Sequence, residues 1–140
     1  MEKSKRLAIY VAGPYTPQTN DIHDAARIAN INTENAIRAG IEVLKKGHFP
    51  YIPHLSHYVH LRMKDGEALP KEAWYSLDMT WLAKCDALLY LAPSFGADAE
   101  LKWAKEHGME IFLRTEDIPD VSETATKEKA HHPQKVQIRR

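Results

Sequence analysis

The sequence has 140 residues, with 19 basic and 19 acidic side chains and one cysteine, Cys85. This length suits one domain with its own core, and the zero net charge excludes a global field that would draw the chain to nucleic acid or to a membrane surface. A single cysteine excludes an internal disulfide, as is typical of a reducing compartment. The first apolar run, Leu7 to Ala12, is too short for a signal peptide or a membrane span. We therefore expect a cytoplasmic protein with no membrane or nucleic-acid partner.

Apolar runs alternate with segments of helical periodicity along the chain. We expect strands over about 7–12, 49–53, 87–92 and 110–114, and helices over about 21–46, 70–84 and 97–107. Thr19 or Asn20 is the expected cap of the first helix, and Pro70 the first residue of the second. Prolines in 49–53 predict an edge strand. The order predicts a parallel sheet wound by right-handed crossovers and covered by helices.

Two segments have little regular pattern. Residues 54–69 indicate only a helical turn over about 55–61 and a loop at Asp65-Gly66. Residues 122–140 hold few apolar side chains and, from 127 onward, five basic residues against one acidic residue. We therefore expect a domain over 1–121 and a basic tail over 122–140 that is disordered or ordered only by a partner.

Glu100 is the first candidate catalytic residue. Counted at about 100° per residue, it falls on the apolar side of its helix with Leu101 and Ala104. A glutamate near a helix start can instead complement the macrodipole or close a capping box. Ser94 and Glu100 are six residues apart, however, whereas a box needs about three. Because open α/β sheets bind ligands at the carboxyl ends of their strands, an inward carboxylate at this point indicates a functional role.

Asp78 is the second candidate. It falls between Trp74 and Leu82 on the apolar side of the helix over 70–84, where an unpaired acid is costly. The alternative is a structural aspartate bonded to backbone N–H groups or to a lysine. Two inward acids beside one strand resemble the carboxylate pair of glycosyl transfer, in which one is the nucleophile and the other handles the proton of the leaving group.

The turn after the first strand, Gly13-Pro14-Tyr15-Thr16, lies where nucleotide-binding folds meet phosphate or ribose. It is not a G-x-G-x-x-G motif and the chain has no P-loop, which disfavours a dinucleotide or a triphosphate. The three-residue spacing of His54, His57 and His60 is not one that zinc sites favour, so we expect no metal and place His54 near the rim of the pocket. Asp86 is interpreted as a turn residue.

Four motifs occur in a specific order. They are Tyr10-Val11-Ala12-Gly13-Pro14-Tyr15-Thr16, then Gly47-x-x-Pro50-x-x-Pro53-His54, then Asp78 followed by Cys85-Asp86, and Ser94-x-Gly96-Ala97-x-x-Glu100. Over about residues 7–113 this set resembles the nucleoside 2-deoxyribosyltransferase-like superfamily, including its nucleoside 5′-monophosphate N-glycosidase branch. The tail lies outside the resemblance.

The resemblance implies a flavodoxin-like (Rossmann-like) three-layer fold with a parallel sheet of four or five strands. It implies cleavage of an N-glycosidic bond through a covalent sugar–enzyme intermediate, with no metal or redox cofactor. Glu100 matches the nucleophile, Asp78 the acid that assists the departing base, and Tyr15 a tyrosine near the nucleophile. Family members generally form homo-oligomers that share site residues. We expect the substrate to contact Gly13, Pro14, Thr16, His54, Ser94, Gly96 and Ala97.

Ser94 is where the chain departs from the transferases of this superfamily, which carry aspartate. The hydrolases carry serine, and there it contacts the 5′-phosphate, which favours a nucleotide substrate. The Gly13 to Thr16 turn, in contrast, lacks the Gly/Arg-rich phosphate loop of the hydrolases. Hydrolase and transferase, and nucleoside and 5′-monophosphate, therefore stay open. A rival hypothesis is a nucleotide-binding or sensor module that releases no base, and a second is a structural subunit.

Overall fold

The computed structural model describes residues 5–122, and its centre is a sheet of four strands. The strands are β1 (Ala8–Ala12), β2 (Phe49–Tyr51), β3 (Ala87–Tyr90) and β4 (Glu110–Phe112). They lie in the order β2-β1-β3-β4, and every neighbouring pair is parallel. The prediction of a parallel sheet of four or five strands is confirmed, and so is the edge position of the strand that contains Pro50.

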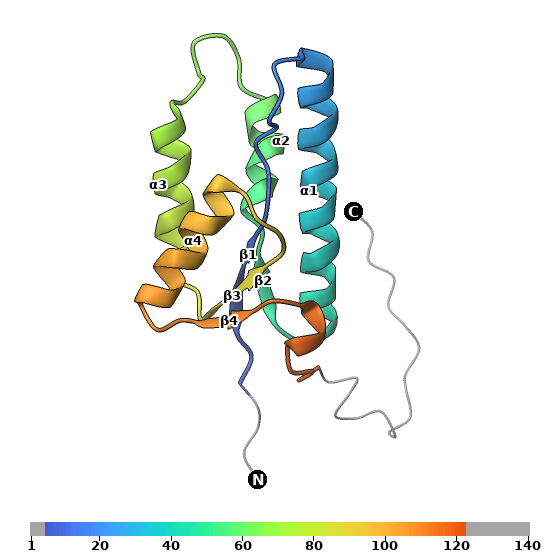
Figure 1. Ribbon diagram of the computed structural model, residues 1–140, viewed down its shortest axis with the longest axis vertical. Coiled ribbons are helices and arrows are strands. Elements are labelled where there is room, and N and C mark those ends of the chain that lie inside the picture. The colour runs from blue at the N-terminus through green and yellow to red at the C-terminus, as the bar shows by residue number, and fades with distance from the viewer. Residues whose placement is uncertain (1–4, 123–140) are drawn as a thin grey trace.

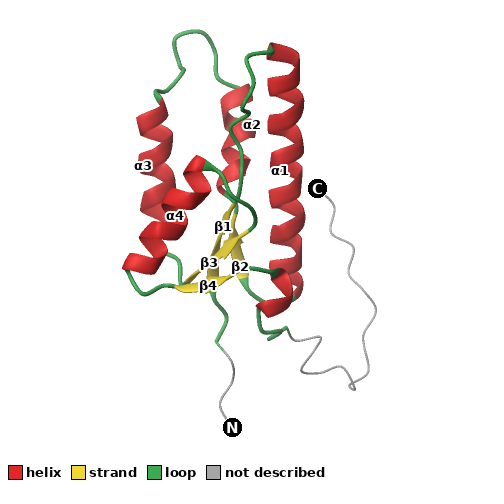
Figure 2. Cartoon of the chain, in the orientation of Figure 1, coloured by secondary structure: helices red, strands yellow, loops and turns green. Residues whose placement is uncertain are grey.

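Four helices connect and cover the strands. They are α1 (Ile22–Lys45), α2 (Ser56–Leu61), α3 (Lys71–Leu82) and α4 (Phe95–Glu106). Figure 1 shows α1 on one side of the sheet and α3 with α4 on the other, and Figure 2 shows the strands enclosed between these helices. The arrangement is an α/β three-layer fold of the flavodoxin-like type, as predicted.

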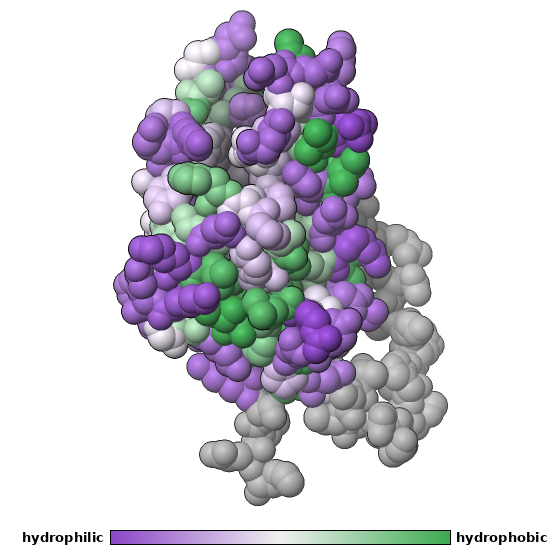
Figure 3. All heavy atoms as spheres, viewed as in Figure 1, coloured by the Kyte–Doolittle hydropathy of each residue, from purple (hydrophilic) through white to green (hydrophobic). Residues whose placement is uncertain are grey.

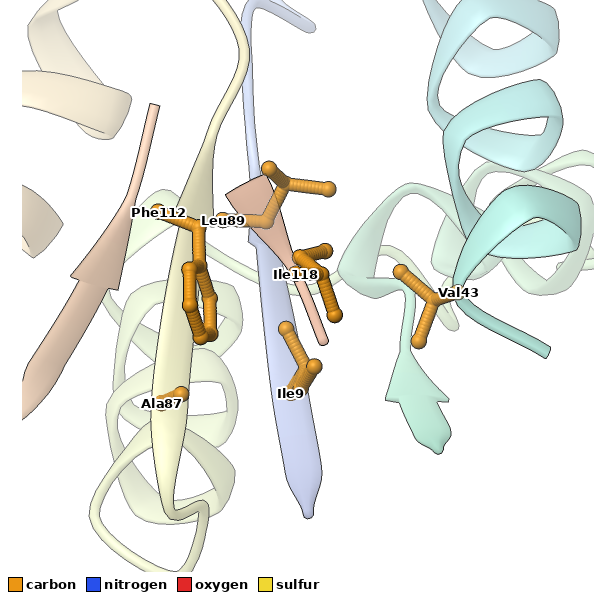
Figure 4. Close-up of a cluster of buried hydrophobic side chains, with 6 residues drawn as sticks. All are labelled: Ile9, Val43, Ala87, Leu89, Phe112 and Ile118. Atoms are coloured by element: carbon orange, nitrogen blue, oxygen red, sulfur yellow. The ribbon is translucent and has the colours of Figure 1, made fainter. Parts of the chain in front are cut away.

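Alternation along the strands divides the core into two layers, because successive side chains point to opposite faces of a sheet. The layer on the α1 side, drawn in Figure 4, consists of Ile9, Val43, Ala87, Leu89, Phe112 and Ile118. The layer on the α3 and α4 side consists of Tyr10, Ala12, Leu82, Leu88, Ala97 and Ala104. The second layer includes a tyrosine, whose hydroxyl needs a polar partner inside the protein.

The helix starts differ slightly from those expected. Asp21, rather than Thr19 or Asn20, caps α1, because its side chain accepts a hydrogen bond from the Asp24 N–H at 2.9 Å. Pro70 is the cap of α3 and not its first residue. α4 starts at Phe95, two residues before the expected start, because Ser94 is its cap.

The segment after β4 is part of the domain. Ile118 is 2% exposed and belongs to the core layer on the α1 side. Lys46 donates hydrogen bonds to the carbonyls of Thr115 and Ile118, and His48 lies 2.7 Å from the carbonyl of Pro119. The domain therefore reaches at least to this segment, and the predicted basic tail lies outside the described residues, except for Ser122.

Apolar side chains also reach the surface. Figure 3 shows one apolar area over β4 and a second over the upper part of α1, and polar side chains cover much of the rest of this face. Among residues 5–122, no helix is both long enough and apolar enough to cross a membrane.

Gly40 lies where α1 packs against Pro50 and Ile52 at the sheet edge. It is buried in the interior of the helix, where glycine usually costs about 1 kcal/mol relative to alanine. A Cβ atom at this position would meet the side chain of Ile52, with Cδ1 nearest and Cγ1 at 3.0 Å. The glycine therefore allows α1 to contact the residue that follows β2.

We predict that Gly40→Ala lowers the free energy of unfolding by about 1 kcal/mol, because overpacking against Ile52 outweighs the gain in helix propensity. In the Ile52→Val background, which lacks Cδ1, the same change should instead be neutral or stabilising. Urea denaturation of the four proteins of this double-mutant cycle measures the coupling. Additive effects would contradict the contact as the cause.

Candidate active site

The two central strands end side by side, and the chain leaves them in opposite directions. α1 leads from β1 to β2 over one face of the sheet, and α4 leads from β3 to β4 over the other (Figure 1). Ligands of open α/β sheets bind at such a point, outside the carboxyl ends of the strands. The segments that border it are the turn over 13–17 and the turn over 91–94.

Glu100 lies in the second turn of α4 and is 8% exposed. Its Oε2 accepts a hydrogen bond from the Tyr10 hydroxyl at 2.6 Å. Burial raises the pKa of Glu100 from the ordinary 4.5 to about 7, the hydrogen bond from Tyr10 opposes this rise, and the charge of Asp78 adds to it. The inward orientation predicted from helical spacing is confirmed, and near neutral pH the carboxyl is poised between its two protonation states.

Asp78 lies on α3 and is half-buried, with its Oδ1 atom buried and without a hydrogen-bond partner among residues 5–122. Burial raises its pKa from 3.8 to about 6. The alternative reading of a structural aspartate requires bonds to backbone N–H groups or to a lysine, and this oxygen has none. A buried, unpartnered carboxyl oxygen of this kind is costly unless the group is protonated or meets a ligand.

The two carboxyls are electrostatically coupled. The charge of Asp78 raises the pKa of Glu100, of Tyr10 and of Tyr51, so its field reaches each of these groups. Two acids that repel each other do not both ionise easily, so the pair holds one proton over part of the neutral range. The hydrogen bond from Tyr10 lowers the pKa of Glu100, but at about 7 this pKa stays above that of Asp78, at about 6, so the free protein holds the shared proton mainly on Glu100.

Tyr10 is the site residue that the sequence reasoning missed. Its ring stacks on Tyr51 at 5.6 Å between centroids, and Tyr51 in turn stacks on Trp81 at 5.8 Å. Burial, followed by the charge of Glu100, raises the pKa of Tyr10, so the hydroxyl stays a donor. A signal was present in the sequence, because a tyrosine within a strand buried on both faces requires a partner for its hydroxyl.

Tyr15, predicted as a tyrosine near the nucleophile, contacts α1 and α2. Its hydroxyl lies 2.8 Å from Nδ1 of His57, and its carbonyl accepts a hydrogen bond from the Asn32 amide at 3.2 Å. His57 is buried, and burial raises the pKa of Tyr15. Thr16 is exposed. The contacts of Tyr15 thus fix the turn after β1 to α1 and α2.

His54 holds the start of the same turn. Its Nε2 lies 3.0 Å from both the Gly13 and the Pro14 carbonyl oxygens, and since carbonyls only accept, Nε2 is the protonated nitrogen. Burial lowers the pKa of His54, and the two backbone hydrogen bonds oppose this shift. The ring is therefore neutral near pH 7, with a bare Nδ1. Among residues 5–122, the histidines at 54, 57 and 60 form no cluster suited to a metal ion.

Ser94 caps α4. Its Oγ accepts a hydrogen bond from the Ala97 N–H at 3.0 Å, and Gly96 is exposed in the first turn. This cap occupies one of the backbone N–H groups that the expected phosphate site would use. The Ser94 hydroxyl keeps its proton as a donor.

Two hollows of the surface have linings that contain neither member of the carboxyl pair. One, of about 280 Å³, is lined by Gly13, Pro14, Asn32, Asn35, His54, Leu91 and Ala92. Another, of about 340 Å³, is lined by Pro50, Tyr51, Ile52, Pro53, Leu55, Ser56, Val59, Trp74 and Leu77. Neither lining includes Glu100 or Asp78, although the first contains three of the expected substrate contacts and the second the ring of Tyr51.

Fold and site together define a flavodoxin-like α/β domain with a coupled carboxyl pair, of which Glu100 is buried and Asp78 half-buried, beside the carboxyl ends of its strands. A family model described as a domain of unknown function, DUF7768, matches residues 7–114, and the chain belongs to this family. No curated protein in the comparison matches the chain.

The raised pKa values predict how stability depends on pH. The folded state holds a proton on Glu100 up to about pH 7, whereas the unfolded chain releases it near 4.5. The folded state thus binds more protons in this window, so the free energy of unfolding falls as pH rises from about 4.5 to 7. Asp78 contributes in the same direction between about 3.8 and 6.

We expect the free energy of unfolding of the wild type to fall by about 2–3 kcal/mol between pH 4.5 and 7.5 because of Glu100, and Glu100→Gln to remove this part of the fall. Urea denaturation across this range measures it, with Glu34→Gln at an exposed position of α1 as the matched control. A wild-type slope that Glu100→Gln leaves intact would show that another group causes it.

Proposed function

We propose that this protein cleaves or transfers the N-glycosidic bond of a nucleoside, a deoxynucleoside or a nucleoside 5′-monophosphate, with release of the free base. The observation that carries the proposal is the coupled carboxyl pair, buried beside the carboxyl ends of the two central strands. The ordered motifs that resemble the nucleoside 2-deoxyribosyltransferase-like superfamily support it independently.

The proposed first step starts from the less populated one-proton state, in which Glu100 is ionised and Asp78 holds the proton. A carboxylate oxygen of Glu100 then forms a bond to the anomeric carbon of the sugar while the carbon–nitrogen bond to the base breaks. The bonding pair moves to the base nitrogen, and the proton held by Asp78 neutralises the departing base. The transition state has oxocarbenium character, which a nearby anionic oxygen stabilises. Tyr10 keeps Glu100 oriented and favours its ionised form.

In the second step, water or an acceptor base attacks the anomeric carbon and releases Glu100 as a carboxylate. Asp78, now ionised, takes the proton from the attacking group and returns to its starting state. Water gives a hydrolase and an acceptor base gives a transferase. The raised pKa of Asp78, at about 6, suits a group that gives and takes a proton near neutral pH.

We predict that Glu100→Gln lowers the rate at which free base is released roughly a thousandfold or more, which corresponds to an increase of about 4 kcal/mol in the activation barrier. Chromatography of reactions with a panel of nucleosides and 5′-monophosphates measures this rate.

We also predict that Asp78→Asn slows the reaction of substrates with poor leaving groups much more than that of activated substrates. Equal losses on both classes would point to a structural aspartate.

The assay of base release also distinguishes an enzyme from a nucleotide-binding or sensor module. A binding or sensor module would bind nucleosides or nucleotides without ever releasing base, and Glu100→Gln would then change only affinity. A folded Glu100→Gln protein with near-normal turnover would exclude Glu100 as the nucleophile. Thermal melting of each variant shows that it is folded.

We also propose that the chain forms a homo-oligomer through the apolar groove beside the edge strand β2. Leu55, Val59 and Leu77 line this groove and are 45%, 54% and 39% exposed. Sedimentation of the full chain should give a dimer or larger species, and Val59→Lys should shift it toward the monomer, because a charge on a buried apolar contact is costly. A monomeric wild-type protein at micromolar concentration would contradict the proposal.

A further inference from the structure

The hollow of about 280 Å³ lies between the middle of α1 and the ends of β1 and β3. Two carboxamides from α1 reach it, those of Asn32 and Asn35, which are one helical turn apart. Leu91 and Ala92, directly after β3, form its apolar part. None of the mechanistic steps above uses either asparagine.

Every polar group in this lining is uncharged near pH 7. Asn32 donates from its amide nitrogen to the Tyr15 carbonyl, which leaves its Oδ1 as an acceptor, and Asn35 is exposed. The Gly13 and Pro14 carbonyls already accept from His54. His54 is 5% exposed, and its Nδ1 has no partner among residues 5–122. The lining thus offers amide edges and acceptors and no cation.

The hollow and the carboxyl pair lie on opposite sides of the end of β1. Ala12 packs with Tyr10 and Ala97 in the layer that holds Glu100. The next residue, Gly13, lines the hollow, and its backbone lies so close to the other rim that a Cβ atom would come within 3.2 Å of Leu91 Cβ. The end of β1, packed against Leu91, therefore separates the hollow from the carboxyl pair, and a ligand that reaches both has to lie over this strand end.

We infer that this hollow binds the 5′ end of the sugar and accepts it as a hydroxyl rather than as a phosphate, an inference that rests on the proposed function. In the proposed function the base lies beside Asp78 and the anomeric carbon at Glu100. The remaining part of the substrate, the 5′ end of the sugar, then extends over the end of β1 to the hollow. A hydroxyl both donates to and accepts from carboxamides. A phosphate dianion is bound best by cations, which this lining lacks, and its charge is opposed here by the carbonyl and amide oxygens.

The position of Ser94 agrees with this assignment. Its Oγ accepts a hydrogen bond from the Ala97 N–H, so the serine serves the start of α4 and occupies an N–H group that a phosphate there would use. The protein should therefore prefer nucleosides over their 5′-monophosphates.

The test compares the four 2′-deoxynucleosides with their 5′-monophosphates on the full chain, by calorimetric affinity and by kcat/KM for base release. We expect the best nucleoside to exceed its monophosphate at least tenfold in both. Asn35→Ala should weaken that nucleoside about three- to tenfold, as loss of one hydrogen bond does. Asn35→Lys should improve the monophosphate at least tenfold without improving the nucleoside, because the new cation meets the phosphate.

Glu34→Ala is the matched control, since it lies next to Asn35 on the exposed face of α1 but outside the lining, and it should change neither ligand. A wild-type preference for monophosphates, or Asn35 variants that behave like Glu34→Ala, would overturn the inference while base release still upholds the proposed function. Binding of nucleosides that Asn35→Ala weakens, with no base released, would uphold the hollow as a binding site and overturn the proposed function. Absence of both binding and release would overturn both.

Discussion

The hydrogen bond between Tyr10 and Glu100 joins the central strand β1 to α4 inside an otherwise apolar layer. A carboxyl buried to this degree is costly unless it is bonded or protonated, and here both remedies operate, since Tyr10 donates to it and burial raises its pKa to about 7. The bond therefore sets the orientation of Glu100 and keeps it responsive to protons near neutral pH. The second acid, Asp78 on α3, is also partly removed from water, and this burial raises its pKa to about 6.

Hydrogen bonds from backbone N–H groups to distant side chains join the starts of the strands. Asp86, interpreted from the sequence as a turn residue, accepts a hydrogen bond from the Ala8 N–H at 2.8 Å and so joins the starts of β3 and β1. Leu7 donates to Nδ1 of His48 at 3.0 Å, which fixes the start of β1 beside β2. These contacts lie at the amino ends of the strands. The carboxyl ends are thus left to the loops that border the candidate site.

Those loops are organised by neutral side chains rather than by charge. His54 and Asn32 hold three successive carbonyls, of Gly13, Pro14 and Tyr15, and so order a turn that has no regular secondary structure. The two sides of the strand ends consequently differ in chemistry, with acids on the α3 and α4 side and amides on the α1 side. A substrate that spans them would meet proton transfer at one end and uncharged hydrogen bonding at the other.

The sequence by itself determined the order of strands and helices, the edge position of the strand with Pro50, and the inward faces of Glu100 and Asp78. Each depends on local periodicity or on the backbone limits of proline, which neighbouring residues set. Only the tertiary structure decided that Tyr10, 90 residues from Glu100 along the chain, is its partner, and that Tyr15 instead meets His57. It also decided that Ser94 caps α4 and that Asn35 reaches a hollow beside Leu91. The physical reason is that strand register, crossovers and side-chain rotamers bring distant residues together, and local pattern does not fix these.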